Sequence, residues 1–365
     1  MLQRTPIPTY HVERVASVAR FLELEPEWNR LAANFSTPLL HHEWFAASVD
    51  AFLGCSELAI FVARDALGSV HAIAPFVLER EGVFQRLRLL GYRTLEPAGL
   101  LCEDRAALKP VIDAIAALGI PLELRRLGAA SCEISALCDA PMRRTVRMIQ
   151  PGHASSTWAR LESSAEALEA KLSPGRRSEL RRKRKQAEQG GAVTFEAVVP
   201  TEATVAANLD RLFEVEASGW KGRAKTAILA DAPLRQFYTR YAAAAAGLGE
   251  LRFFFLGIGG ETAAAIMAVE HAERLWELKI GFQERWSKCS PGLILAHETL
   301  RHASDQGLAA YEFLGGSDGW QERWPHAKHA YSSFRSFPLS PSGGYFLAKD
   351  IGSALWRRAT RPVKT

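Results

Sequence analysis

The sequence has few cysteines and no long apolar run. Its five cysteines are odd in number and never form a Cys-x-x-Cys pair, which argues against a disulfide framework and favours free thiols. The longest apolar stretches, such as 241–248, fall well short of the ~20 residues that span a bilayer. The first residues, MLQRTPIPTYHVERV, contain no apolar core of a signal peptide. We therefore expect a cytoplasmic protein without a transmembrane segment.

A general excess of positive charge is also missing. The 365-residue chain has a net charge of +5, yet residues 171–190 contain eight basic and two acidic side chains, so the remainder carries a net charge of −1. This distribution argues against a surface that coats nucleic acid. The composition, 48% apolar and 23% charged, is that of a folded protein, and the length suits two domains.

Two blocks of the sequence share one pattern. In each, a helical region precedes two apolar strands joined by a glycine-containing turn, and a third strand follows. The strands are LAIFVAR, SVHAIAPFVLE and RLRLLGY in the first block, and LRFFFLGI, ETAAAIMAVEH and LWELKIGF in the second. We interpret the blocks as two copies of one α/β unit. The predicted domains are residues 1–150 and 151–340, divided near Pro151-Gly152, with a basic helix or tail at 341–365.

The third strand of the second block leads into a well-marked helix start. Glu277 and Lys279 alternate with apolar residues in LWELKIGF, which predicts a strand. Ser290 suits an N-cap, Pro291 suits the first helical position, and apolar residues then recur at helical spacing until Gly307. A strand that feeds a helix N-terminus presents backbone N–H groups and the positive end of the helix dipole, which suits an anionic group such as a pyrophosphate.

Four segments carry a family resemblance. They are LSPGRRSELRRKRKQAEQGGAVTFEAV at 172–198, ASGWKGRAKTAI at 217–228, the strand and Ser-Pro-Gly helix just described, and YEFLGGSDGW at 311–320. In this order they resemble the GNAT acyltransferase superfamily. The resemblance is closest to the paired GNAT-like domains that include the CelD-like proteins associated with cellulose biosynthesis and are related to Fem-type peptidyltransferases. The resemblance covers about 172–324, and the N-terminal half fits by pattern only.

The resemblance implies a fold and a reaction. The fold class is α/β (α+β): two tandem GNAT-like domains, each a mixed, mostly antiparallel twisted sheet flanked by helices. The reaction is N-acyl transfer from acetyl-CoA or another acyl-CoA to an amine on a small molecule, a sugar or a cell-envelope or polysaccharide precursor. We expect the first domain to bind no cofactor, because Glu103 and Asp104 stand where an anion site requires neutral or basic groups.

The resemblance also places candidate site residues. In GNAT-like folds the cofactor lies in a gap between the strands that correspond to LWELKIGF and YEFLGG, and its pyrophosphate meets the N-terminus of the intervening helix. The implied cofactor-binding residues are Lys279, Lys288, Ser290, Gly292, Leu293 and Ile294, the last three through backbone N–H groups. The implied acceptor-binding residues are Trp220, Lys221, Trp320 and Gln321.

Two acidic residues are candidates for the general base. Glu277 projects from the strand nearest the expected thioester, and Asp318 follows the next strand, so either can relay the proton of an amine. The alternatives are an ion pair of Glu277 with Lys279 and a turn-capping role for Asp318.

Two other functions stay open. Many relatives carry an aromatic residue followed by lysine where this chain has Trp320-Gln321, which is consistent with a changed substrate or lost activity. A Fem-like transferase would take its acyl group from aminoacyl-tRNA and hold the RNA with the basic segment Arg176–Lys185. A non-catalytic scaffold in polysaccharide synthesis or export would retain the fold alone. The basic segment is equally consistent with a solvated helix paired with acids of another domain, because aromatic residues do not interleave with it.

A metal site is not expected. The segment from His297 to His302, HETLRH, resembles a zinc-protease motif, but its histidines are five positions apart. At about 100° per residue they are separated by roughly 140° around a helix and cannot chelate one ion together.

Overall fold

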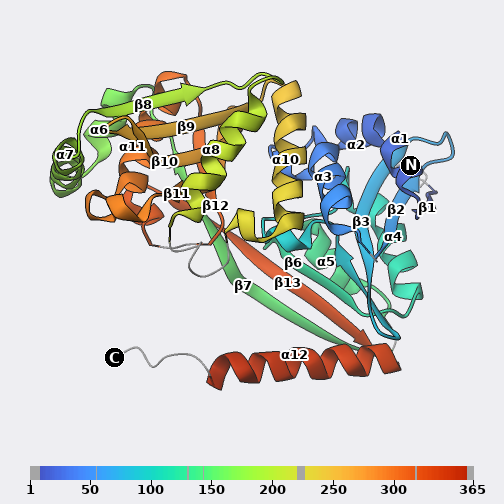
Figure 1. Ribbon diagram of the computed structural model, residues 1–365. Coiled ribbons are helices and arrows are strands. Elements are labelled where there is room, and N and C mark those ends of the chain that lie inside the picture. Colours follow the sequence, from blue (N-terminus) through green and yellow to red (C-terminus); the bar gives the residue numbers. More distant parts are fainter. Residues whose placement is uncertain are drawn as a thin grey trace, which may run out of the picture.

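The computed structural model describes residues 9–359 except 55, 130, 143, 220–226 and 317–318 (Figure 1). Thirteen described strands join in one sheet in the order β1-β2-β3-β4-β6-β13-β7-β12-β11-β10-β9-β8, and β5 pairs with β3 beside this path. The strands are β1 His11–Val15, β2 Glu57–Arg64, β3 Val70–Glu81, β4 Phe84–Leu89, β5 Leu101–Cys102, β6 Leu122–Gly128, β7 Thr145–Arg160, β8 Val193–Val198, β9 Leu251–Ile258, β10 Glu261–His271, β11 Arg274–Phe282, β12 Ala310–Leu314 and β13 Ala327–Pro338.

Helices flank this sheet on both faces. The α-helices are α1 Val18–Glu23, α2 Glu25–Ala32, α3 His42–Phe52, α4 Arg105–Ala117, α5 Cys132–Asp139, α6 Ala165–Lys171, α7 Pro174–Glu188, α8 Val205–Ala217, α10 Ala232–Gly247, α11 Pro291–Asp305 and α12 Pro341–Ala359. Short 3₁₀ turns lie at η1 Pro38–Leu40, η2 Tyr92–Thr94, η3 Ile228–Ala230, η4 Glu284–Cys289 and η5 Gln321–Arg323.

Each half of the sheet repeats one pairing pattern. In the first half, β1 to β4 are antiparallel neighbours and β6 runs parallel to β4. In the second half, β8 to β11 are antiparallel neighbours in the order of the chain, and β12 runs parallel to β11. The two parallel pairs therefore lie on either side of the centre of the sheet. This confirms the predicted fold of two tandem, mixed, mostly antiparallel units flanked by helices.

Two long strands at the centre belong to both halves. Strand β13 pairs with β6 on one side and with β7 on the other, and β7 pairs with β12 through Thr157–Arg160. The predicted division at Pro151-Gly152 lies inside β7, between the segments that pair with the two ends of β13. The end of the chain thus returns to complete the first half, and the position of a domain boundary stays a prediction.

The core lies on both faces of the sheet. In the first half, α1 to α3 cover one face and α4 and α5 the other; in the second half, α6, α7 and α11 cover one face and α8 and α10 the other. Helix α3 also packs against α10, where the Trp44 ring lies 4.8 Å from those of Phe237 and Tyr241. These buried aromatic contacts join the two halves.

The last helix lies below the sheet in Figure 1. Its beginning is fixed on the first half, where Phe346 is fully buried under the Arg86 guanidinium. Its end exposes Ile351, Leu355 and Trp356. None of the helices in the described ranges is long and apolar enough to cross a membrane. The four cysteines within those ranges carry free thiols.

Candidate functional site

Strands β11 and β12 begin side by side and then separate. They pair in parallel only through Arg274–Trp276 of β11 and Ala310–Glu312 of β12. Strand β11 continues to Phe282, and a register shift against β10 places a bulge between its residues Glu277 and Lys279. Within the described residues, the β12-facing edge of β11 has no strand partner beyond Trp276. A strand edge of this kind can take up an extended ligand as an added strand.

Helix α11 begins at the mouth of this opening. Pro291 occupies its first turn as predicted, and Ser290 before it has a left-handed backbone (φ 54°). The Ser290 side chain makes no capping hydrogen bond. Instead, its carbonyl oxygen accepts the N–H groups of Leu293 (3.0 Å) and Ile294 (3.2 Å). Two of the three amides that were expected to bind phosphate are therefore already bonded within the helix start.

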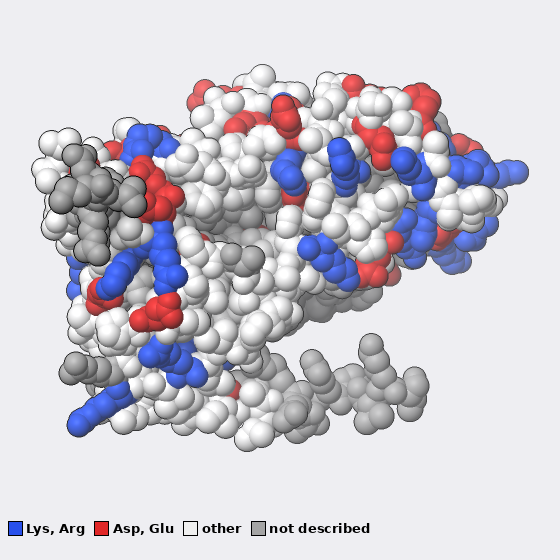
Figure 2. All heavy atoms as spheres, turned by 180° about the vertical axis from the view of Figure 1, so that it is seen from behind, with Lys and Arg blue, Asp and Glu red and all other residues white. Residues whose placement is uncertain are grey.

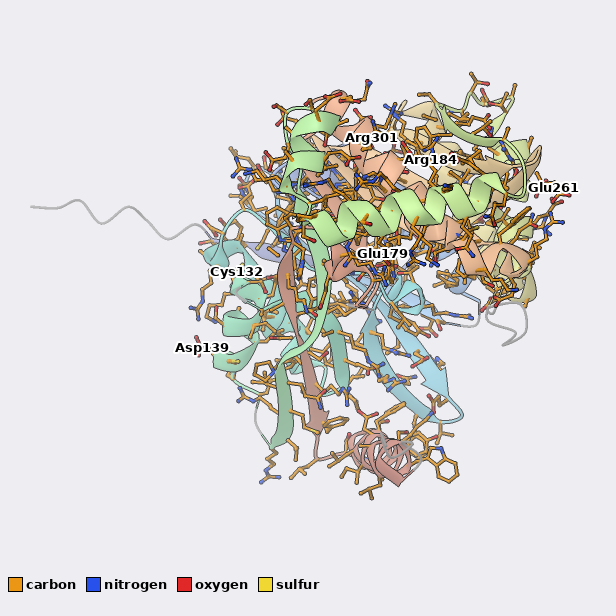
Figure 3. All side chains as sticks on the ribbon, turned by 90° about the vertical axis from the view of Figure 1, so that its left-hand side faces the viewer. Cys132, Asp139, Glu179, Arg184, Glu261 and Arg301 are labelled. Carbon is orange, nitrogen blue, oxygen red and sulfur yellow. The ribbon has the colours of Figure 1, made fainter. Side chains whose placement is uncertain are left out.

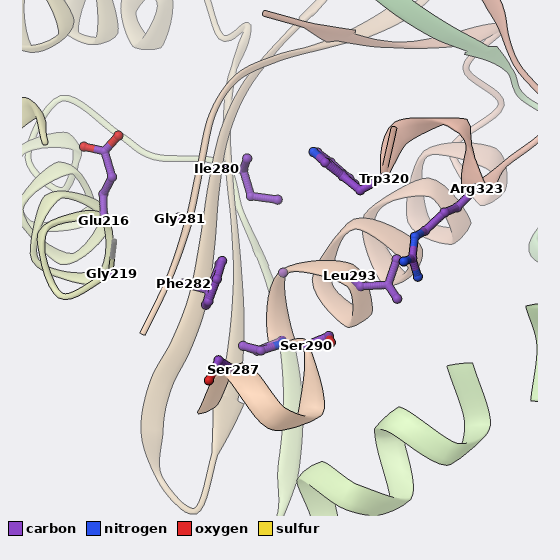
Figure 4. Close-up of a pocket in the computed structure, with 12 residues that line it drawn as sticks. Glu216, Gly219, Ile280, Gly281, Phe282, Ser287, Ser290, Leu293, Trp320 and Arg323 are labelled. Carbon is purple, nitrogen blue, oxygen red and sulfur yellow. The ribbon is translucent and has the colours of Figure 1, made fainter. Parts of the chain in front are cut away.

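A cavity of about 410 Å³, here called the β11–β12 cavity, lies in the opening (Figure 4). In Figure 4 the end of α8 lies on one side of β11, and α11 with the segment after β12 lies on the other. The lining residues are Glu216, Gly219, Ile280, Gly281, Phe282, Ser287, Ser290, Pro291, Gly292, Leu293, Trp320 and Arg323. The structure thus brings Ser290, Gly292, Leu293 and Trp320, all expected at the site, around one cavity.

Two glycines let α8 approach β11 at this cavity. A Cβ atom at Gly281 would lie 2.9 Å from the Cα of Glu216, and one at Gly219 would lie 2.9 Å from the carbonyl oxygen of Phe282. Real Cβ atoms do not come so close to backbone atoms, so a side chain at either position would push the helix away. The close approach carries Glu216 to the wall of the cavity.

Glu216 is a buried carboxylate that the sequence analysis did not select. Its side chain is 4% exposed, and it accepts the backbone N–H of Ile228 at 2.9 Å. The signal was present in the sequence: Leu209, Leu212 and Phe213 make one apolar face of α8, and Glu216 continues that face. A carboxylate on the buried face of a helix is uncommon without a specific role.

Arg323 supplies positive charge on the α11 side, and sequence reasoning did not find it either. Its Nη1 donates to Glu179 of α7 at 2.7 Å. Burial acts to raise the pKa of Glu179, but Arg323 and the neighbouring arginines outweigh it, so the pKa is lowered. Trp320 beside it packs edge-on against Phe313 and Trp324. The bond to Glu179 therefore holds the Arg323 guanidinium at the wall of the cavity.

Lys279 lies away from α11, the side on which a phosphate was expected. Its Nζ is 4.8 Å from the ring centre of Tyr238 on α10. Burial acts to lower the pKa of Lys279, but Tyr238 and the carboxylates of Glu96 and Glu216 outweigh it and raise the pKa. The bulge in β11 explains this orientation, because it breaks the strict alternation that placed Lys279 and Glu277 on one face.

Glu277 is buried and does not line the cavity. Its carboxylate accepts a hydrogen bond from the hydroxyl group of Tyr311. Tyr311 pairs with Leu275 just before the strands separate. Burial, together with this carboxylate, raises the pKa of Tyr311 well above its ordinary value. The second candidate base, Asp318, lies outside the described residues.

The other expected residues are distributed differently. Lys288 is exposed, and its carbonyl oxygen accepts the Nζ of Lys183 at 2.6 Å. Gln321 is 4% exposed and does not line the cavity. Trp220 and Lys221 lie outside the described residues. Among the residues that the structure describes, no three His, Cys, Asp or Glu side chains come together as a metal site would require.

The basic helix α7 runs along the outside of α11 (Figure 3). Figure 2 shows blue side chains gathered at the end of the molecule that this helix forms. Arg184 pairs with Glu298 of α11 and with Glu188 of its own helix, so part of the basic segment is paired within its own half of the chain. Arg181, Arg182 and Lys185 are exposed and have no ion pair with the described residues.

Comparison with known proteins agrees with this geometry. Residues 174–322 match the model of the acetyltransferase (GNAT) domain family. No curated protein matches the sequence. Among solved structures, FemX is 9% identical with a TM-score of 0.60, over 92% of this chain and 99% of that chain.

Two further solved structures are similar. The carboxy-terminal domain of a putative lysylphosphatidylglycerol synthetase from Agrobacterium fabrum is 12% identical with a TM-score of 0.54, over 92% of this chain and 97% of that chain. L-PGS from Bacillus licheniformis is 12% identical with a TM-score of 0.54, over 89% and 96%. At these identities the structural likenesses establish the fold alone.

Proposed function

We propose that this chain, whose residues 174–322 match the model of the acetyltransferase (GNAT) domain family, is an N-acyltransferase that moves an acyl group, acetyl in the simplest case, from acyl-CoA to an amine. The observation that carries the proposal is the β11–β12 cavity. It combines an edge of β11 that has separated from β12, a helix N-terminus and a cation on one side with a buried carboxylate on the other. These are the groups that binding a thioester donor and deprotonating an amine require.

The donor would lie along the edge of β11 where it has separated from β12. The amide groups of its pantetheine arm would pair with the backbone beyond Trp276, as an added strand does. Its phosphates would meet the start of α11 and Arg323. Gly292 permits close approach there, because a Cβ atom would meet only Phe282 and Ile280 side chains, at 3.5 and 3.8 Å.

We assign the general base to Glu216 in place of Glu277. Glu216 lines the cavity, whereas Glu277 is bonded to Tyr311 beneath it. The amine nitrogen forms a bond to the thioester carbonyl carbon, and its proton passes to the Glu216 carboxylate, directly or through a water molecule. The carbon–sulfur bond then breaks, and the thiolate takes a proton from solvent. For the acceptor we propose an amine on a sugar or another cell-envelope or polysaccharide precursor, following the motif resemblance.

The test is calorimetric titration of the full chain with acetyl-CoA and desulfo-CoA. Gly292→Glu adds negative charge at the expected phosphate position, and we expect it to reduce affinity at least a hundredfold. Gly247→Glu is the matched control, because Gly247 lies at the exposed end of α10 with open space around it. Micromolar binding that survives Gly247→Glu and is lost in Gly292→Glu supports the proposal. No binding by the wild type contradicts it and favours aminoacyl-tRNA as the donor or a scaffold.

A second candidate donor is aminoacyl-tRNA, and exposed α7 is the observation that favours it. Arg181, Arg182 and Lys185 are exposed on one helix, and none of them forms an ion pair with the described residues. RNA held there would bind with an affinity that falls steeply with salt. Changing all three residues to glutamine should then remove tRNA binding without changing the thermal midpoint. Equal tRNA binding by the triple variant and the wild type would exclude this role of α7.

A further inference from the structure

The first half of the molecule contains a counterpart of the β11–β12 opening. Strands β4 and β6 pair in parallel only at Leu87 with Leu122 and at Arg88 with Glu123, after which they separate. A cavity of about 190 Å³, here called the β4–β6 cavity, lies at that point. The two openings therefore occupy equivalent places in the two units of the sheet.

Helix α4, which lies between β4 and β6 in the chain, has acidic side chains at its N-terminus. Helix α4 begins after Asp104, whose carboxylate accepts the N–H of Ala107 at 2.8 Å and caps the helix. The neighbouring Glu103 is paired with Arg30 and His71. Carboxylates thus take the place that a ligand anion would occupy at a helix start.

Arginines line the β4–β6 cavity instead. Arg88, Arg125 and Arg126 face it together with two carboxylates, Glu96 and Glu123, so the lining carries one unbalanced positive charge. Glu123 is further surrounded by arginines: Arg86 and Arg335 lie within 3.3 and 3.6 Å of its oxygens. Outside the cavity, Glu79 pairs with Arg86 and Arg88, and Asp350 pairs with Arg335.

The arginine side chains retain unused hydrogen-bonding capacity. The Nε of Arg126 is buried and has no hydrogen-bond partner among the described residues. The Nε of Arg88 lies 2.9 Å from Glu123 but lacks the alignment of a hydrogen bond. Its guanidinium is stacked on Tyr92, 3.5 Å from the ring centre, which fixes its plane. A planar, pre-oriented guanidinium is the usual partner of a carboxylate or phosphate.

The backbone around this cavity is strained. Leu95 (φ 60°) and Arg126 (φ 57°) both line it, and both adopt the left-handed conformation that residues with a side chain rarely take. Such strain persists only where the surroundings enforce it, and it is concentrated at binding sites. The N–H of Ala98 bonds to the Arg126 carbonyl at 3.2 Å and holds the two strained segments together.

We propose that the β4–β6 cavity binds a small ligand through an oxyanion, a carboxylate or a phosphate, held by Arg88, Arg125 and Arg126. The site is distinct from the β11–β12 cavity and is linked to it through the end of β12. Arg126 donates to the carbonyl of Gly315 at 2.5 Å, and Glu96 accepts the N–H of the same residue at 3.2 Å. Gly315 follows β12, and the chain then returns to the lining residues Trp320 and Arg323. The proposal concerns binding alone and does not depend on acyl transfer.

The experiment is a titration of the full chain, monitored by thermal midpoint and by calorimetry at constant ionic strength. One arm uses inorganic phosphate and pyrophosphate, and the other uses succinate and citrate. Arg126→Gln and Arg125→Gln each remove one positive charge from the lining of the cavity. The Arg125 side chain is partly exposed, so we expect Arg125→Gln to fold. Arg80→Gln is the control, because Arg80 is an exposed, paired arginine of the same half that does not line the cavity.

We expect saturable binding of at least one anion class by the wild type and by Arg80→Gln, with at least tenfold weaker binding by both lining variants. The arm that binds identifies the oxyanion as phosphate or carboxylate. The proposal is overturned if neither class binds saturably, or if folded lining variants bind as tightly as the wild type. Acetyl-CoA titrations of the same variants report on the β11–β12 cavity separately, so the two proposals can fail independently.

Discussion

Replacing Glu216 by glutamine tests the assignment of the general base. Glutamine keeps the shape of the side chain and retains an oxygen that can accept the N–H of Ile228. It removes the negative charge that acts on Lys279, so we expect a folded variant whose free energy of unfolding is lower by about 1–3 kcal/mol. It cannot accept a proton. General-base catalysis contributes about 10²–10⁴ in rate, which corresponds to about 3–5 kcal/mol of barrier. We therefore expect kcat to fall by that factor while affinity for acetyl-CoA changes little.

The assay is release of the CoA thiol in the presence of a panel of primary amines. Glu214→Gln is the matched control, because Glu214 is an exposed carboxylate on the same helix. A kcat for Glu216→Gln within about twofold of the wild type, in a folded variant that binds acetyl-CoA, would refute the assignment. An equal loss in Glu214→Gln would show that charge on α8, and not the position of Glu216, is responsible.

Three further predictions concern stability. Gly281→Ala should lower the free energy of unfolding in urea by about 1–3 kcal/mol through overpacking against α8, whereas Gly247→Ala, with open space around it, should not lower it. Trp44→Ala should cost about 3–5 kcal/mol, because its buried ring joins the two halves; a loss below 1 kcal/mol would contradict this. Burial lowers the pKa of His297 to about 4, so the folded state binds this proton less readily than the unfolded state. The free energy of unfolding should therefore fall by up to about 3 kcal/mol as the pH is lowered from about 6.5 towards 4, because protonation of His297 favours the unfolded state. Urea titrations of His297→Gln over this pH range should show a smaller fall.

Local patterns in the sequence predicted much of the fold. Strand periodicity gave the three antiparallel strands of each unit, and Pro291 marked the start of α11. The exchange of β7 and β13 between the halves was not predicted, because pairing between strands far apart in the chain leaves no local pattern. A boundary was therefore predicted within β7, where Pro151-Gly152 resembles a linker.

The structure gathers only some of the expected residues around the β11–β12 cavity, for identifiable reasons. Strict alternation misplaced Lys279, because a bulge is not visible in the residue pattern. Arg323 was missed because it comes from a short turn that packs against α7. Glu216 was missed although its position on the apolar face of α8 distinguishes it. A carboxylate that interrupts a buried helical face is the feature that would have identified it.

A crystal structure of the protein with acetyl-CoA shows directly where the donor binds. We expect the pantetheine arm along the edge of β11 beyond Trp276, phosphates beside Gly292 and Arg323, and the thioester on the Glu216 side of the opening. Acetyl-CoA bound with the β11–β12 cavity empty, for example at the β4–β6 cavity, would contradict this expectation.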